Sequence, residues 1–559
     1  MSQVLDLAGR LRALTDDELV RLLRIRGGSS TNLKDFFDLA EWLLQPKNMT
    51  HYVNSLPKSA LLYVSGSSDA QASPVLEFIR DGKYVEFVEL ANEPLSKESQ
   101  KANANSDSVA GIHAFESISS ITELVFDLEH RILREVGKQG ISLADAKRLA
   151  SLTGKELDFV RSIFELSAAA GLITPIDGRW ALTLRAAEWV AATAEQRWTL
   201  LASTWLELLG LSAAEELRQE ISRGVPLAKA MRACFPLERF ETTSRFGHIL
   251  TYANLLGLSI EQTVSSWTSQ LLESDSAGAA KLIGAALPKT QARIIIQGDL
   301  SVIAPGPLST EDERELRSFV EIEQAGLASR YRMSALSVSF GMESGLSVDQ
   351  IRQTIQKLSG GTLPQPVDYL LNDAVKRFGR IRVVEDPRSG GCFVYSTDAT
   401  LLTELANDSR LKPYNLIRLD STCLSSRFAR DIVYFGLREV GHCAIRSDQA
   451  GKPISPLRFV ANASQKAESG DWIQTVARLR QSDHSISSSS DDEAIMRQIL
   501  LAIKSKAKVS VIFTGQNDLE QTMLLEPSGV ANGRMRARDR KADIERTIPI
   551  ANISSVSFL

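Results

Sequence analysis

Four arginines stand at alternate positions near the end of the chain, where they could contact a polyanion. These residues are Arg534, Arg536, Arg538 and Arg540. Alternate side chains of a β-strand share a face, so the spacing predicts an exposed arginine face, with Met535 and Ala537 pointing inward. Like charges in a row repel each other, and phosphate groups would offset that cost. The alternative is a solvated strand face whose arginines pair with Asp539, Asp543 or Glu545.

ATP hydrolysis needs a phosphate-binding loop that ends in Gly-Lys-Ser/Thr, because the hydroxyl holds Mg²⁺. Four Gly-Lys pairs occur in the chain, and they begin at Gly82, Gly137, Gly154 and Gly451. The residues that follow them are Tyr84, Gln139, Glu156 and Pro453. The acidic Asp492-Glu493 follows a serine run rather than a buried strand, so we interpret it as a helix start. We therefore expect no ATPase motor and no enzymatic activity.

Cys423, His442 and Cys443 are the other residues that could do chemistry, as metal ligands or as a thiol nucleophile. Their spacing fits no zinc pattern, and small buried residues beside one hydrogen-bonded histidine are the simpler interpretation. No C-x-x-C, G-x-S-x-G or H-E-x-x-H motif occurs in the chain. We therefore expect no metal site, no cofactor and a reducing cytoplasmic environment.

The composition indicates a globular protein with several domains. Hydrophobic residues make up 43% and charged residues 24% of 559 residues, too many for one core. No apolar run reaches the roughly 18 residues that span a bilayer, and the start lacks the features of a secretory signal. The net charge of −4 counts against a large DNA footprint. Local basic faces can still act, because salt screens charges more than about 10 Å apart.

Composition shifts divide the chain into seven segments. We expect an N-terminal helical module over 1–90, a polar linker over 91–120, a winged helix over 121–185 and a helical domain over 186–290. A mixed domain over 291–480, a serine-rich linker over 481–492 and a small β-barrel-like module over 493–559 follow. The predicted fold class is α+β, mostly helical and multidomain, with winged-helix-like units and the small terminal module.

The winged helix is predicted from the order helix, helix, glycine turn, helix and hairpin in 121–185. Its third helix carries Lys155 and Arg161, but acidic residues stand among them, so it would meet phosphates poorly. In the wing, Arg179 and Trp180 are better candidates for contacting DNA. A winged helix used for protein contact is the alternative.

The segment 331–408 contains ordered sequence blocks that carry a resemblance to a known family. The blocks include Tyr331-Arg332-Met333, Ser344-Gly345-Leu346-Ser347, Ile355-Gln356-Lys357-Leu358-Ser359, Phe378-Gly379-Arg380-Ile381-Arg382-Val383 and Phe393-Val394-Tyr395-Ser396. They resemble the domain that precedes the motor in XPB-type helicases, over roughly 290–450. Phe378 and Arg380 stand where the family usually has tyrosine and lysine. On a strand, Arg380 and Arg382 would share one side while Ile381 and Val383 are buried, so both arginines are candidates for DNA contact.

Two further resemblances concern the ends of the chain. The run from Leu14 to Arg26 is similar to the start of actinobacterial helicase-associated proteins, which have this layout without a motor. The terminal module resembles a WYL domain around Pro527, Gly533 and 546–550, although the Trp-Tyr-Leu signature itself is missing. These resemblances imply a DNA-binding accessory protein in DNA repair that acts with a separate helicase or nuclease. A transcription regulator with a ligand- or nucleic-acid-sensing terminal module, or a protein-interaction scaffold, are the alternatives.

Overall fold

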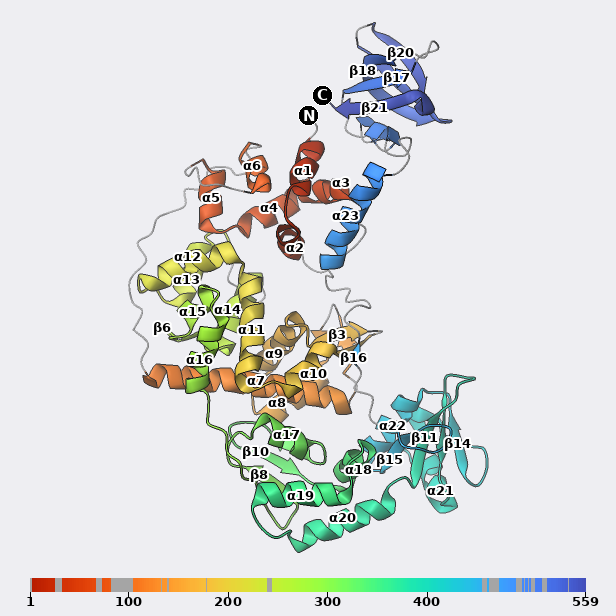
Figure 1. The fold of residues 1–559 in the computed structure, drawn as a ribbon. Coiled ribbons are helices and arrows are strands. Elements are labelled where there is room, and N and C mark those ends of the chain that lie inside the picture. Colours follow the sequence, from red (N-terminus) through yellow and green to blue (C-terminus); the bar gives the residue numbers. More distant parts are fainter. Residues whose placement is uncertain are drawn as a thin grey trace. The chain divides into compact units, whose positions relative to one another are not determined.

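The computed structural model divides the chain into two compact units (Figure 1). Unit 1 comprises Met1–Pro94, Arg232–Glu238 and Glu468–Leu559, and unit 2 comprises Leu95–Met231 and Arg239–Ala467. The structure describes residues 3–25, 33–66, 73–81, 104–131, 133–137, 140–176, 178–238, 244–454, 460–461, 472–488, 495–496, 498–500, 502–503, 508–514, 520–540 and 542–558. Helices predominate over small sheets, which confirms the predicted α+β, mostly helical fold class. No helix among the described residues is long and apolar enough to cross a membrane.

Six N-terminal helices build one core of unit 1. They are α1 (Gln3–Arg12), α2 (Asp16–Ile25), α3 (Phe36–Leu44), α4 (Pro46–Asn54), α5 (Lys58–Val64) and α6 (Pro74–Asp81). Thr15 and Glu18 form a capping pair at the start of α2. The backbone N–H of Thr15 donates to the Glu18 carboxylate at 2.8 Å, and the backbone N–H of Glu18 donates to the Thr15 hydroxyl at 3.3 Å.

A late helix, α23 (Trp472–Ser488), completes this core. Its Val476 and Leu479 are buried among the N-terminal helices. Arg480 donates to the carbonyl oxygens of Arg12 and Leu14 at 2.7 and 2.5 Å. The prediction of a linker over 481–492 is therefore wrong for 481–488, which are helical, while 489–492 lie outside the described residues. A helix docked by one apolar side and by charged contacts can be polar elsewhere, which explains the misleading composition.

The terminal module of unit 1 is an open antiparallel sheet. Its strands are β17 (Val509–Thr514), β18 (Glu520–Ala531), β19 (Arg534–Asp539), β20 (Ile544–Pro549) and β21 (Ile553–Phe558), in the order β20-β19-β18-β17-β21, with η2 (Ile550–Asn552) before β21. Among the described residues β20 and β21 do not pair, so the sheet is not the β-barrel-like module expected from the sequence. Ile495, Ile499 and Ala502 are buried against the inner face, which therefore does not need to close on itself.

Unit 2 begins with a long helix, α7 (Ala104–His130), where a linker was expected over 91–120. That prediction is wrong for 104–120, and 91–103 lie outside the described residues. Apart from Val109, the start of α7 as far as Gly111 has no large apolar side chain, and other backbones approach the helix closely there. A Cβ on Gly111 would lie 2.4 Å from the Ala286 carbonyl oxygen, and one on Gly257 would lie 2.3 Å from that of Ala110. Small residues are thus the packing surface at the start of α7, whereas larger residues such as Ile118 and Leu124 are buried further along.

The elements after α7 follow the predicted order. They are β1 (Glu135–Val136), β2 (Gly140–Ile141), α8 (Leu143–Thr153), α9 (Leu157–Ala169), β3 (Ile173–Ile176) and β4 (Arg179–Thr183). The Ser142 hydroxyl caps α8, and Gly154 ends it in the left-handed conformation with φ 64°. Strand β4 pairs with β3, with β16 (Val460–Ala461) in parallel, and with Arg134 through one isolated bridge. We call the sheet around β3 and β4 the wing.

The helical body of unit 2 packs against α7 (Figure 1). It contains α10 (Leu184–Ala191), α11 (Ala194–Leu209), α12 (Leu211–Ser222), α14 (Arg245–Leu255), α15 (Thr268–Leu272), α16 (Ser276–Ala286) and the ribbon β5 (Ser259–Ile260) with β6 (Thr263–Val264); α13 (Leu227–Cys234) extends from it. Trp198 and Trp205 are fully buried, and their indole N–H groups donate to the carbonyls of Leu256 and Ile249. This body is a scaffold built from apolar packing, in which Trp198 and Trp205 also find hydrogen-bond partners.

Residues 291–454 form two lobes with separate cores. The first lobe has the sheet β7 (Ile295–Ile296), β8 (Ser301–Ala304), β10 (Ser329–Arg332), β9 (Glu321–Gln324), with α17 (Thr310–Arg317), α18 (Ala335–Glu343), α19 (Val348–Ser359) and α20 (Gln365–Arg377). The second lobe has the sheet β13 (Ile417–Arg418), β14 (Cys423–Ser426), β12 (Cys392–Tyr395), β11 (Ile381–Glu385), β15 (Ala444–Ser447), with α21 (Ala399–Asn407), η1 (Lys412–Tyr414) and α22 (Arg430–Glu439). The hairpin β11–β12 is thus part of a five-stranded mixed sheet.

A buried ion pair connects α17 of the first lobe to α7. Arg317 donates to both carboxylate oxygens of Glu123 at 2.5 and 2.6 Å, and its guanidinium lies 3.9 Å from the Phe126 ring centroid. Burial opposes the charge on Arg317, but the attraction of Glu123 outweighs it and raises the pKa of Arg317. Burial also raises the pKa of Glu123, against the attraction of Arg317. Two N–H groups on two oxygens need an acceptor-only carboxylate, so we treat the pair as ionised.

A second buried carboxylate, Glu343 of α18, joins the two lobes. Glu343 accepts from the backbone N–H of Arg446 at 2.8 Å and from the Tyr434 hydroxyl at 2.6 Å. The Arg446 guanidinium lies 4.6 Å from the Tyr434 ring centroid, and its Nε is 3.5 Å from Glu343. Both charged side chains are almost fully buried. The lobes therefore meet through a hydrogen-bonded charge pair as well as through apolar packing.

Candidate nucleic-acid interface

The four arginines lie as the sequence predicts, three of them on strand β19 and Arg540 directly after it. Met535 and Ala537 are fully buried in the core of the terminal module. Arg534, Arg536, Arg538 and Arg540 are all exposed. The turn before β19 has φ 53° at Asn532 and 70° at Gly533, which is the two-residue hairpin geometry that Asn-Gly favours. The tight turn fixes the register and thereby the face on which the arginine row lies.

The second half of the row is neutralised by carboxylates. Arg538 lies opposite Glu526 on β18 and Glu545 on β20, and it forms an ion pair of 2.8 Å with Asp543. Arg540 forms an ion pair of 2.7 Å with Glu526. The hydrogen bond from Arg540 lowers the pKa of Glu526, which therefore stays ionised at neutral pH. We call Arg538 and Arg540 the neutralised pair.

The first half of the row has neutral neighbours. Arg534 lies opposite Ala531 and Pro549, and Arg536 lies opposite Gly529 and Thr547. Neither arginine has an ion pair with any residue that the structure describes. We call Arg534 and Arg536 the free pair. Its two exposed charges lie on adjacent outward positions of one strand, which is the arrangement that a phosphate backbone would neutralise.

Asp539 has a structural role in the hairpin rather than a role in the arginine row. Its side chain is 5% exposed and accepts from Arg546 Nε at 2.8 Å and from the backbone N–H of Ala542 at 3.2 Å. Of the three carboxylates considered as partners of the row, Asp543 alone forms a direct ion pair with it. Glu526 was not among the three, because its place opposite Arg538 depends on the β-bulge between Pro527 and Gly529.

The two arginines of the helicase-like segment are less available than predicted. Ile381 and Val383 are buried, as the alternation predicts. Arg380 is exposed but forms an ion pair of 2.6 Å with Asp398, the capping residue of α21. Arg382 is half-buried, and its Nη1 lies only 2.4 Å from where a Cβ on Gly451 would stand. Both side chains are engaged within the second lobe.

The wing separates its two predicted contact residues onto opposite faces. Arg179 is exposed, whereas Trp180 is only 5% exposed. Trp180 donates its indole N–H to the Gly140 carbonyl at 3.1 Å and meets the Phe164 ring edge-on at 4.7 Å. The prediction of Trp180 as a surface contact is therefore wrong. Consecutive strand residues must face opposite ways, so both could not contact one ligand from the same face.

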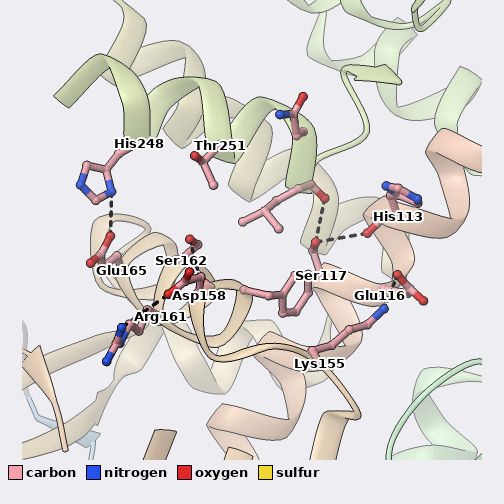
Figure 2. A pocket seen from close by; sticks show the side chains of 13 residues that line it. His113, Glu116, Ser117, Lys155, Asp158, Arg161, Ser162, Glu165, His248 and Thr251 are labelled. Atoms are coloured by element: carbon pink, nitrogen blue, oxygen red, sulfur yellow. Dashed lines mark hydrogen bonds and ion pairs between the residues drawn. The ribbon is translucent and has the colours of Figure 1, made fainter. Parts of the chain in front are cut away.

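Helix α9 lines a cavity of about 670 Å³ together with α7 and α14 (Figure 2). Its charges are compensated locally. Lys155 Nζ lies 2.6 Å from Glu116, Arg161 lies 3.4 Å from Asp158, and His248 Nδ1 lies 2.8 Å from Glu165. Each base in this set has an acid of its own, so the cavity offers no net positive surface. This agrees with the prediction that the third helix would meet phosphates poorly.

The cysteines and His442 are not poised for chemistry. Burial raises the pKa of the Cys392 thiol to about 12 and also raises the pKa values of Cys423 and Cys443. Burial lowers the pKa of His442. Across the described residues, no three His, Cys, Asp or Glu side chains gather where they could hold a metal ion. Neutral thiols are weak nucleophiles, so these residues are best treated as packing residues.

One part of the chain is similar in sequence to helicases. Residues 294–420, which span the first lobe and much of the second, match the family described as helicase conserved C-terminal domain. The DNA 3'-5' helicase XPB of Mycobacterium tuberculosis is 25% identical over 134 residues, which are 23% of this chain and 24% of that protein. The chain thus covers about a quarter of that relative. This part of the chain is helicase-related, and the family description names a C-terminal rather than a front-end helicase domain.

Proposed function

We propose that the protein is a DNA-binding accessory factor in DNA repair, that it acts in the cytoplasm with a separate helicase or nuclease, and that it does not hydrolyse ATP. The free pair on β19 is the observation that carries this proposal. Two exposed arginines with neutral neighbours are costly to hold side by side unless an anion compensates them. Because another segment of the chain is helicase-related, the phosphate backbone of a nucleic acid is the anion that we favour.

The proposed absence of ATPase activity rests on the sequence and on the use of its lysines. No Gly-Lys pair is followed by serine or threonine. Of the four pairs, Gly154-Lys155 is used structurally, because Gly154 ends α8 and Lys155 pairs with Glu116. A phosphate loop would need that glycine and lysine to face a nucleotide. A motor would therefore have to come from the partner.

The transcription-regulator alternative keeps the WYL-like terminal module as a sensor. In that case the arginine row would bind a regulatory ligand, and the DNA contacts would lie elsewhere. Loss of DNA binding on changing the free pair would favour the accessory-factor proposal. Unchanged DNA binding would favour the regulator.

The test is a fluorescence-anisotropy titration of the purified chain on duplex, forked and single-stranded DNA at several salt concentrations. Each phosphate contact should add about 0.9 to the slope of log affinity against log salt on duplex. Arg534→Ala/Arg536→Ala should flatten this slope by roughly two units. ATP turnover with and without DNA should stay at background. Unchanged binding by the variant, or ATPase activity that survives repurification, would overturn the proposal.

A further inference from the structure

Arg134 and Arg179 lie directly opposite each other at the edge of the wing. They form an isolated antiparallel bridge. The flanking hydrogen bonds run from Glu135 N–H to the Gly178 carbonyl at 3.0 Å and from Trp180 N–H to the Leu133 carbonyl at 2.9 Å. This pattern makes Arg134 and Arg179 a non-hydrogen-bonded pair, the closer of the two antiparallel arrangements, with Cα atoms about 4.5 Å apart.

The side chains of Arg134 and Arg179 both project from the outer face of the wing. Leu133 and Trp180, the next opposed pair, are buried at 0% and 5% exposure and therefore mark the inner face. Arg134 and Arg179 are both exposed. Neither forms an ion pair with any residue in the described part of the chain. Directly opposed like charges destabilise a sheet, and no residue that the structure describes supplies a counter-ion for this pair.

We infer that Arg134 and Arg179 form an arginine clamp for one phosphate of a nucleic-acid backbone. Two planar guanidiniums can each present parallel N–H donors to the oxygens of the same phosphodiester. Contacts of this kind fix position and orientation rather than read sequence. The inference rests on the proposed function, since it assumes that the protein binds DNA, and it adds a second contact site in unit 2.

The surroundings favour the backbone as the ligand. Lys155, just before α9, pairs with Glu116, and Arg161 on α9 pairs with Asp158, so this region does not compete for phosphate. Arg134 and Arg179, in contrast, have no carboxylate partner among the described residues. Arg131, three residues before Arg134, already pairs with Asp127 at 3.7 Å and supplies a natural contrast.

The test compares Arg134→Ala/Arg179→Ala with Arg131→Ala by anisotropy on a 20-base-pair duplex and a 20-nucleotide single strand. The double variant should lose about tenfold in affinity at low salt, and its salt slope should flatten by about 0.9 on duplex. Arg131→Ala should bind like the parent, because Asp127 keeps Arg148 as its partner at 2.8 Å. Arg134→Lys/Arg179→Lys should retain most of the salt slope but lose part of the affinity, because lysine cannot bind in a bidentate way.

Melting without DNA gives an independent readout. Removing either member of an uncompensated like-charge pair should leave the melting temperature unchanged or raise it. A lowered melting temperature would show that the arginines support the fold, and the clamp would be wrong. If the double variant binds like the parent while Arg534→Ala/Arg536→Ala binds weakly, the clamp fails and the proposed function stands. If the parent binds neither DNA, both fail.

Discussion

Arg317 of unit 2 and the free pair of unit 1 have opposite roles. In unit 2, Arg317 is 6% exposed and is bound by the carboxylate of Glu123. On β19 of unit 1, Arg534 and Arg536 are exposed and have no carboxylate opposite them. A buried charge must have its partner inside the protein, whereas an exposed charge can find one outside. The presence of an internal partner thus separates arginines that hold the fold from arginines available for binding.

The largest expected effect comes from breaking the buried pair. Glu123→Gln should destabilise unit 2 by about 3–5 kcal/mol, because it leaves Arg317 buried without a counter-charge. Tryptophan fluorescence during urea unfolding reports mainly on unit 2, because this unit contains the buried Trp180, Trp189, Trp198, Trp205 and Trp267.

Glu116→Gln is the matched control, since Glu116 also lies on α7 and also pairs with a base, but near the surface. It should cost about 1 kcal/mol or less. Equal losses for Glu116→Gln and Glu123→Gln would contradict the argument from burial.

The two halves of the arginine row give the next effect. Arg534→Ala/Arg536→Ala and Arg538→Ala/Arg540→Ala remove the same charge, so the long-range field changes equally. The free pair should account for most of the change in salt slope, because the neutralised pair already holds Glu526 and Asp543. Salt titrations on one duplex measure both variants. Identical slopes would show that internal ion pairs do not withhold arginines from DNA.

A variant that should bind DNA more tightly tests the comparison between paired and unpaired arginines more directly. Glu526→Gln should release Arg540 and steepen the salt slope by about 0.9, which corresponds to one more phosphate contact. Glu545→Gln changes the charge equally but leaves Arg538 paired with Asp543. The same titration compares the two variants. If both strengthen binding alike, net charge rather than pairing controls affinity.

The smallest effect concerns stability. Arg534→Ala/Arg536→Ala should change the free energy of unfolding of the terminal module by about 0.5 kcal/mol or less, because both side chains are exposed and form no ion pair with a described residue. Hydrogen exchange of the β18 and β19 amides measures it locally. A marked loss of protection would mean that the free pair supports the sheet, against its assignment to binding.

Local patterns in the sequence predicted local structure well. Alternation over 534–540 was enough to assign the buried and exposed faces of β19. Composition misled where small or polar residues pack closely. Residues 104–120 resemble a linker because Gly111 and its neighbours meet another backbone without large side chains.

Pairings between distant segments could not be predicted. Glu123 and Arg317 are 194 residues apart, and neither local sequence indicates which residue its charged side chain will pair with. Arg134 stands in a segment too short to show alternation, so its place opposite Arg179 emerged only from the fold. The division of the arginine row depends on a bulge that shifts β18 by one residue.

Helix α7 has a mechanical consequence. Its 27 residues form a rod of roughly 40 Å. The helix is fixed near its start by the close backbone contact between Gly111 and Ala286. Further along, it is fixed by the ion pair of Glu123 with Arg317. Arg134 follows four residues after the helix ends. A helix held at several points along its length moves as a unit instead of bending locally. A displacement of the wing is therefore transmitted to the first lobe and to α16 together.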